Sequence, residues 1–471
     1  MKSIWVFASL LAVTAAWSSG ACAPAKDDEP ANDGGTGATS GKGASNQGGE
    51  ADTGGTSSGA GAPSSAGEAS GGEIGSGGET SAGGETSGGA VAPITQCTTG
   101  SLLAGDPLWT DRLEGEKPAG QGVLDDPPVR NEAIAVIGSK VFVETEFDLW
   151  SFDMSDAAPQ IKRFAGSEPS TFINAGVPCK DTRFLVMRDM TATADGKLVV
   201  ADYVGGAIIE ITDPAGPNCM SHWVAGTHAK TDDPGNDFPL SHGDHDGPGK
   251  DALFGGTEPN GAGVHKLAVD PQGNIYTWDE GTGKVKKIAT DEARTVSTIG
   301  KIGTDDNVMS LAFLKGKLYA VGVDGNNDFM LEVDPDAYDP DAPTANVKEL
   351  FRNRGDQFPE IEGTGHQAIP SDLESDGEAL IVSGQSQFVW RMSTDGTVLT
   401  TLAGSTGSRG PGRVEYEDDF NPTIPHPAEQ WQLGFSLSNP DGGPWLALAG
   451  GKLYWSGGFA TGKHILQFTC K

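Results

Sequence analysis

The chain of 471 residues carries 65 acidic and 32 basic side chains, which gives a formal net charge of −33 at pH 7. So acidic a surface repels phosphate backbones, and this excludes nucleic acid as a partner. Two interpretations of the acidity stay open: it keeps an extracellular protein soluble, or it binds divalent cations.

The N-terminus has the features of an export signal over residues 1–21. Lys2 precedes an apolar run at residues 4–16, which is too short to cross a bilayer, and small residues lead up to Cys22. Cys22 resembles the acylated cysteine of a bacterial lipobox. This resemblance implies a lipid anchor, with the outer membrane favoured and its face left open. The alternative is plain secretion of a protein with a stray cysteine.

Residues 22–95 consist largely of Gly, Ser, Thr, Ala and Glu and contain almost no large apolar side chains. Such a segment cannot bury enough surface to offset the loss of chain entropy on folding. We therefore expect a disordered tether over residues 22–95 and a folded domain over residues 96–471.

A short pattern returns six times between residue 131 and the C-terminus. It consists of an apolar β run, a Gly-containing turn and a second β run rich in Val, Leu, Ile, Tyr and Trp. The copies begin at Ala133, Met190, His265, Met309, Ala368 and Trp445. Six such units predict an all-β, six-bladed β-propeller. In the clearest copy we expect strands at 266–269, 275–278, 285–288 and 295–299.

The last copy is one strand short. After residue 456 there is room for only one more strand, at 465–468. Residues 107–115 have the form of an outer strand and precede the first copy. We expect this N-terminal strand to complete the last blade and close the ring, because an unpaired outer edge is a template for aggregation.

The cysteines fit ring closure in an oxidising compartment. Without Cys22, four of the five cysteines remain, an even number. Closure would bring Cys97, near the closing strand, close to the penultimate residue Cys470. Cys179 and Cys219 flank the second repeat and would form the other disulfide.

The third copy resembles a known repeat. Residues 264–287 read V-H-K-L-A-V-D-P-Q-G-N-I-Y-T-W-D-E-G-T-G-K-V-K-K, and D-G-P-G-K-D-A-L-F precedes them at 246–254. This segment resembles the NHL repeat, and residues 193–202 are similar with less of the lead-in. The resemblance implies a six-bladed propeller of the NHL and TolB-like kind. It does not by itself imply an activity.

The longest insertion between repeats, residues 227–263, is rich in histidine and aspartate. Its candidate metal ligands are His242, Asp244, His245 and Asp246. These side chains suit a divalent cation, either zinc or calcium, which is the one cofactor that the sequence suggests. The alternative is a structural turn in which the aspartates accept hydrogen bonds from backbone amides.

Equivalent positions at the start of each repeat should surround the central channel. In four of the six repeats these positions carry polar side chains. They are Asn131, Glu132, Arg188, Asp189, His265, Lys266, His366 and Gln367. We expect them to face one cavity at the channel mouth and to contact a ligand. A water-filled tunnel mouth is the alternative.

One enzyme class with a similar fold has its metal site at the position of this channel mouth. Peptidyl-hydroxyglycine lyases hold zinc through histidines from alternate blades, and His265 and His366 match two of those positions. The third position carries Asn131, so the zinc site would lack one histidine. Residues 96–471 also have no recognisable G-x-S-x-G turn for nucleophilic catalysis.

These observations favour binding over catalysis. We expect a monomeric lipoprotein of the cell envelope whose propeller presents one face to a protein, a peptide or a glycan, with the lipid anchor as its only membrane contact. The alternative function is a metal-dependent lyase or hydrolase that uses the channel mouth. A structural envelope protein without a small ligand is a third interpretation.

Overall fold

The computed structural model divides the chain into two units, residues 1–78 and 79–471, and every residue it describes belongs to the second. The described residues are 93–105, 133–145, 147–156, 159, 161–166, 173–226, 242–256, 263–303, 306–324, 327–353, 360–361, 366–367, 370–384, 388–405, 424–431, 433, 445–457 and 464–471. The predicted export signal, Cys22 and most of the predicted tether lie outside them.

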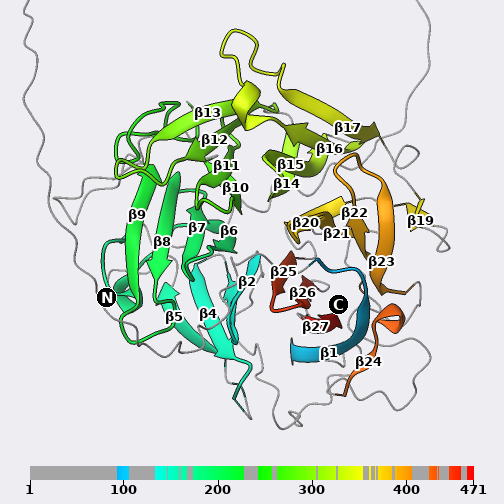
Figure 1. Cartoon of the computed structure of the whole chain (residues 1–471). Helices are drawn as coiled ribbons and strands as arrows, with labels where there is room; N and C mark the ends of the chain where they lie inside the picture. Colours follow the sequence, from blue (N-terminus) through cyan, green and yellow to red (C-terminus); the bar gives the residue numbers. More distant parts are fainter. Residues whose placement is uncertain are drawn as a thin grey trace, which may run out of the picture. The chain divides into compact units, whose positions relative to one another are not determined.

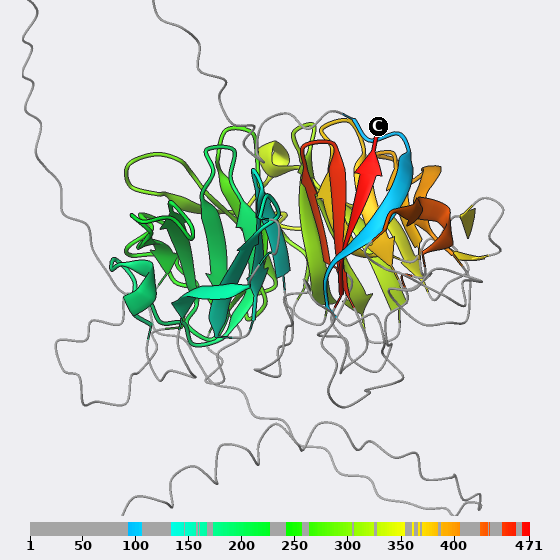
Figure 2. The ribbon, with the colours of Figure 1, turned by 90° about the horizontal axis from the view of Figure 1, so that it is seen from below.

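The described residues form six antiparallel sheets around a common axis, with the first strand of each repeat innermost (Figure 1). From the side, the inner strands run along this axis (Figure 2). The sheets are the blades of a β-propeller, which confirms the predicted fold class. Three short 3₁₀ turns, η1 (Cys179–Asp181), η2 (Pro335–Ala337) and η3 (Ala428–Gln430), are the only helical elements among the described residues.

The blades follow one another along the chain. From the axis outward, the strands are β2 (Ala133–Ile137), β3 (Lys140–Glu144), β4 (Asp148–Asp153) and β5 (Lys162–Gly166) in blade one, and β6 (Met187–Ala192), β7 (Leu198–Asp202), β8 (Ala207–Thr212) and β9 (Met220–Gly226) in blade two. They are β10 (Val264–Val269), β11 (Ile275–Asp279), β12 (Lys284–Ile288) and β13 (Val296–Lys301) in blade three, and β14 (Asp306–Leu314), β15 (Lys317–Asp324), β16 (Asn327–Val333) and β17 (Val347–Asn353) in blade four. They are β20 (Pro370–Ser375), β21 (Leu380–Gly384), β22 (Phe388–Met392) and β23 (Val398–Gly404) in blade five, and β25 (Trp445–Ala449), β26 (Lys452–Gly457), β27 (His464–Cys470) and β1 (Cys97–Gly105) in blade six. The four strands predicted for the third copy match β10 to β13 to within two residues.

The first turn of blade three explains its sequence motif. Asp270 accepts hydrogen bonds from the backbone N–H groups of Gln272 (2.9 Å) and Asn274 (2.8 Å), and from the Tyr276 hydroxyl (3.0 Å). Gly273 has φ +82°, a conformation that a residue with a side chain rarely adopts. The D-x-x-G-N pattern therefore closes the hairpin between β10 and β11.

The core lies between the blades. Successive side chains of a strand point to opposite faces of the sheet, and both faces of each blade are covered by its neighbours. Leu267 and Ile275 of blade three thus pack with Val199 of blade two, whereas Tyr276 packs with Leu311 of blade four. The second strand β11 is consequently buried at all five positions.

Ring closure occurs as predicted, but through a different strand. β1 pairs antiparallel with β27, with Gly100 opposite Phe468, and the short strand β24 (His426–Pro427) pairs with its outer edge. The closing strand is thus Cys97–Gly105. The segment predicted for this place, residues 107–115, lies outside the described residues. A Cβ atom at Gly100 would come within 2.5 Å of the Phe468 ring, so only glycine allows this close pairing.

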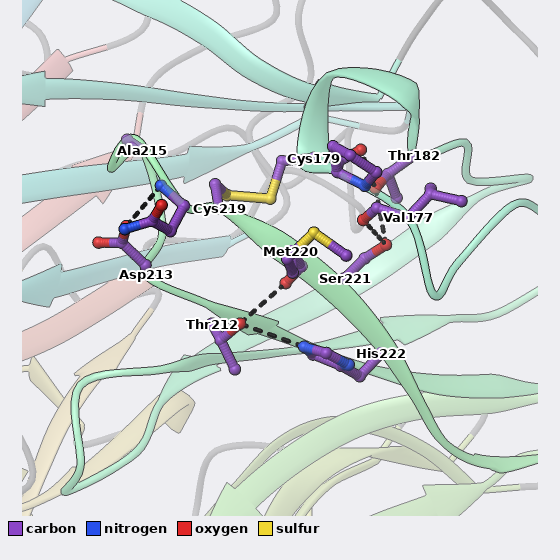
Figure 3. The surroundings of a disulfide bond; sticks show 12 residues. Val177, Cys179, Thr182, Thr212, Asp213, Ala215, Cys219, Met220, Ser221 and His222 are labelled. Atoms are coloured by element: carbon purple, nitrogen blue, oxygen red, sulfur yellow. Dashed lines mark hydrogen bonds between the residues drawn. A yellow bond between two sulfur atoms is a disulfide. The ribbon is translucent and has the colours of Figure 1, made fainter.

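Both predicted disulfides are present. Cys97 bonds to Cys470 between paired strands, and Cys179 bonds to Cys219 (Figure 3). Around the second bond, the segment before β6 pairs with the outer strand of blade two: Ser221 N–H donates to the Val177 carbonyl (3.0 Å), and Cys179 N–H to the Cys219 carbonyl (3.0 Å). This segment covers an otherwise open sheet edge. Two disulfides are typical of an extracellular or periplasmic protein.

Blade five begins later than the sequence pattern indicates. Its innermost strand β20 starts at Pro370, whereas His366 and Gln367 form β19 (His366–Gln367), which pairs only with β18 (Glu360–Ile361) in a separate ladder. The prediction was out of register because it allowed for an insertion in the first turn of blade five, whereas only residues 376–379 separate Ser375 of β20 from Leu380 of β21. No helix in the described part of the chain is both long enough and apolar enough to span a bilayer.

Candidate functional site

The inner strands of blades two to five share one irregularity. Their pairing with the second strand shifts by one residue, between Met187 and Asp189 in β6 and between Val264 and Lys266 in β10, and likewise in β14 and β20. A β-bulge of this kind inserts one residue and changes the direction of the next side chain. The residues inserted in β6 and β10 are Arg188 and His265.

The residue after each of these four bulges lies near the axis, and blades one and six, which have no bulge in this pairing, place one residue there in the same way. We call the six equivalent residues the axial ring. They are Ala133, Asp189, Lys266, Ser310, Asp372 and Trp445, one from each blade. All but Lys266 line one cavity of about 30 Å³ on the axis. Such a volume holds about two water molecules.

Three members of the axial ring hold the next blade. Asp189 accepts a hydrogen bond from Leu267 N–H (2.7 Å), and Asp372 accepts one from Leu446 N–H (2.6 Å). Ser310 accepts an equivalent bond from the inner strand of blade five (3.1 Å). The inner strand of a propeller blade has no strand partner on the axial side, so these side chains satisfy backbone groups that would otherwise be orphaned.

Lys266 spans the axis. Its Nζ lies 4.2 Å from the centre of the Trp445 ring on blade six, opposite its own blade three, and donates to the Arg188 carbonyl oxygen (3.1 Å). The positions of β10 and β25 across the ring can be followed in Figure 1. Lys266 is only 4% exposed. A cation over an indole face is a favourable contact, and here it obstructs the channel.

The axis also carries carboxyl groups, of which Asp372 is buried and Asp189 and Glu374 are partly exposed. Burial raises the pKa of Asp189 to about 6 and that of Asp372 to about 7. Glu374, two residues beyond Asp372 on β20, lines the same cavity. Burial, and then the negative charges of Asp372 and Asp189, raise the pKa of Glu374 to about 8. These groups change charge near neutral pH.

The predicted mouth residues divide into two groups. Arg188 lies 5.5 Å from the Tyr203 ring centre, and His265 lies between the rings of Tyr203 (5.4 Å) and Trp278 (5.7 Å). Asp189 and Lys266, one residue further along each strand, belong to the axial ring. The structure thus brings four of the eight residues together at blades two and three.

The other four predicted mouth residues are not placed at this site. Asn131 and Glu132 lie outside the described residues. His366 and Gln367 belong to β19 and not to blade five. The blade-five equivalent of Lys266 is Asp372 and not Gln367, because the inner strand begins four residues after His366.

His265 is an uncharged group in this environment. Burial lowers its pKa well below the usual value, and the positive charges of Lys266 and Arg188 lower it further. Its Nδ1 atom is buried and has no hydrogen-bond partner among the described residues. A neutral imidazole can accept or donate one hydrogen bond at each nitrogen according to its tautomer.

The aspartates of the insertion hold that segment to blade three. Asp244 forms ion pairs with Lys284 and Lys286, and Asp246 accepts hydrogen bonds from the Thr298 N–H (2.6 Å) and hydroxyl (3.1 Å). This bonding matches the structural-turn alternative. Within the described residues, 242–256 of this insertion included, no three His, Cys, Asp or Glu side chains converge as metal ligands would. The divalent cation stays a prediction.

Sequence reasoning missed two buried carboxylates at the ends of second strands. Asp202 accepts hydrogen bonds from Leu185 N–H (2.8 Å) and Gly205 N–H (2.9 Å), and Asp279 accepts one from Gly255 N–H (2.8 Å). Burial raises the pKa of each to about 6. The signal was present, since both copies end their second strand on aspartate.

No family model matches the sequence, and no curated protein matches it. Solved structures with a similar arrangement include a streptogramin B lyase (11% identity, 73% of this chain and 95% of that chain, TM-score 0.41). Others are a gluconolactonase from Xanthomonas campestris (11%, 81% and 98%, 0.41) and a nidogen/laminin complex (13%, 65% and 92%, 0.36). Likenesses this low carry no conclusion about activity. The class of the protein, a six-bladed β-propeller, follows from its strand order.

Proposed function

We propose that the protein is a cell-envelope lipoprotein whose NHL-like propeller binds a peptide, a protein or a glycan at the channel mouth of blades two and three. One observation carries this proposal: Arg188, His265 and Tyr203 gather polar and aromatic groups there. All three side chains are partly exposed. Convergent polar groups beside aromatic rings are typical of ligand sites.

The axis below this mouth favours a ligand that lies on the surface. Lys266 reaches across to Trp445, and the cavity of about 30 Å³ is too small to enclose a peptide or a glycan. A ligand would therefore contact the mouth through hydrogen bonds and ring stacking. Peptides and glycans offer both kinds of contact.

Peptide and glycan arrays probed with the full chain test this proposal. We expect ligands of the wild-type protein to lose at least tenfold in affinity for His265→Ala and Tyr203→Ala. His222→Ala is the matched control, because His222 lies exposed on the outer strand β9. Equal binding by wild type and His265→Ala, with the fold shown intact by circular dichroism, would refute a site at this mouth.

Lipidation is the second part of the proposal, and it rests on Cys22 alone. Metabolic labelling of expressing bacteria with an alkyne fatty acid should mark the wild-type chain and leave Cys22→Ser unlabelled. Membrane fractionation then assigns the anchored protein to the inner or the outer membrane. An unlabelled wild-type chain in the medium would support plain secretion.

A metal-dependent lyase or hydrolase is a second candidate, favoured by one observation. Asp372 and Glu374 have pKa values of about 7 and 8, which suit general acid–base catalysis at neutral pH. The metal content of protein purified without added ions is the first test. Zinc or calcium at unit stoichiometry would favour this candidate, and turnover that Glu374→Gln abolishes would establish it.

A further inference from the structure

The axial cavity contains more acidic groups than basic ones. Asp189, Asp372 and Glu374 line it, and we call these three the axial carboxyl cluster. Among the residues that the structure describes, Lys266 is the cation whose positive charge acts on Asp189 and Asp372. Three ionised carboxylates around one ammonium would leave excess negative charge at the point where all six blades meet.

The described residues that other strands contribute to the cavity lining carry no positive charge. Strands β2, β14 and β25 contribute Ala133, Ser310 and Trp445, which carry no charge. Arg188 of β6 lies over Tyr203, and the neighbouring His265 of β10 is held neutral. Proton binding by the carboxyl groups would reduce the negative charge of this cluster.

We propose that the axial carboxyl cluster is a pH-sensitive contact that closes the propeller axis when protonated and loosens it when ionised. The cluster lies where neighbouring blades are joined, so its charge acts on the connections between blades. Asp189 joins blade two to three, and Asp372 joins blade five to six, through the bonds to Leu267 and Leu446. Repulsion among ionised members would strain both connections, on opposite sides of the ring.

The direction of the pH effect follows from the raised pKa values. Free carboxyl groups titrate near pH 4, whereas Asp372 and Glu374 titrate at about 7 and 8 in the folded protein. The folded state therefore binds more protons than the unfolded state at intermediate pH. The stability that these groups contribute is complete below about pH 4 and is lost as the pH rises through 7 and 8.

Thermal unfolding of the full chain between pH 6.5 and 9 tests the proposal. Across this window His265 stays neutral in the folded protein, because its pKa is lowered. We expect the Tm of the wild type to fall by several degrees across the window. Glu374→Gln should remove most of this fall and have the higher Tm at pH 9, and Asp372→Asn should act in the same direction.

Glu292→Gln is the matched control, because Glu292 is exposed on the connection before β13 and away from the axis. It should keep the wild-type slope of Tm against pH. A slope that Glu374→Gln leaves unchanged would overturn the proposal. Infrared spectroscopy provides a test that needs no folded variant: wild-type protein at pH 7 should show a protonated carboxyl band that disappears by pH 9, and its absence would equally overturn the proposal.

Discussion

Single residues in this propeller hold charges that the rest of the fold must balance. Lys286 is the clearest case, because its side chain has no exposed surface. It lies 3.1 Å from Asp244, 3.4 Å from Asp246 and 3.8 Å from the fully buried Asp279. Removing one partner of such a group leaves the others buried without compensation.

We predict that Lys286→Met destabilises the protein by about 3–5 kcal/mol, since Asp279 would remain buried opposite no cation. Chemical denaturation of the full chain measures this loss. Lys250→Met is the control, because Lys250 is exposed in the same insertion and should change stability by less than about 0.5 kcal/mol. Equal effects of the two substitutions would contradict the charge assignment.

At the scale of elements, closure of the ring depends on pairing between the first and the last strand of the domain. β1 comes from the start of the domain and β27 from its end, and their pairing completes blade six. The sequence predicted this closure because the sixth repeat lacked a strand. It did not identify the strand, since residues 97–105 contain Thr, Ser and Gly in place of the apolar alternation that marks a strand.

We predict that loss of the Cys97–Cys470 bond costs more stability than loss of Cys179–Cys219. The bonds join residues 373 and 40 positions apart. Loop-closure entropy then gives about 6 and about 4 kcal/mol respectively, before any change in native contacts. The unfolding midpoints of the Cys97→Ala/Cys470→Ala and Cys179→Ala/Cys219→Ala pairs compare them, and peptide mapping without reductant checks the connectivity. The reverse order would show that covalent closure matters less than the strand pairing itself.

At the scale of the whole chain, the propeller should be separable from what precedes it. Ile94 is buried, and its N–H donates to Asp376 (3.0 Å). The N–H groups of Thr95 and Gln96 both donate to the carbonyl of the last residue, Lys471 (2.8 and 3.0 Å). Backbone held in this way is protected from proteases.

We therefore predict that mild proteolysis yields a compact fragment that begins at or before residue 94. The composition of residues 22–95 is the reason to expect cleavage there, because it offers little apolar surface for folding. N-terminal sequencing and intact mass identify the first residue of the fragment. Resistance of residues 31–90 equal to that of the blades would contradict the predicted tether.

The sequence by itself determined the number of blades, the closure of the ring and both disulfides. These features depend on a repeating local pattern, which a sequence records directly. Only the tertiary structure decided the site. Bulges in the inner strands select Asp189, Lys266 and Asp372 for the axis, and the inner strand of blade five begins four residues after His366. A one-residue shift turns a side chain to the other face of a strand, and no local pattern marks where that shift occurs.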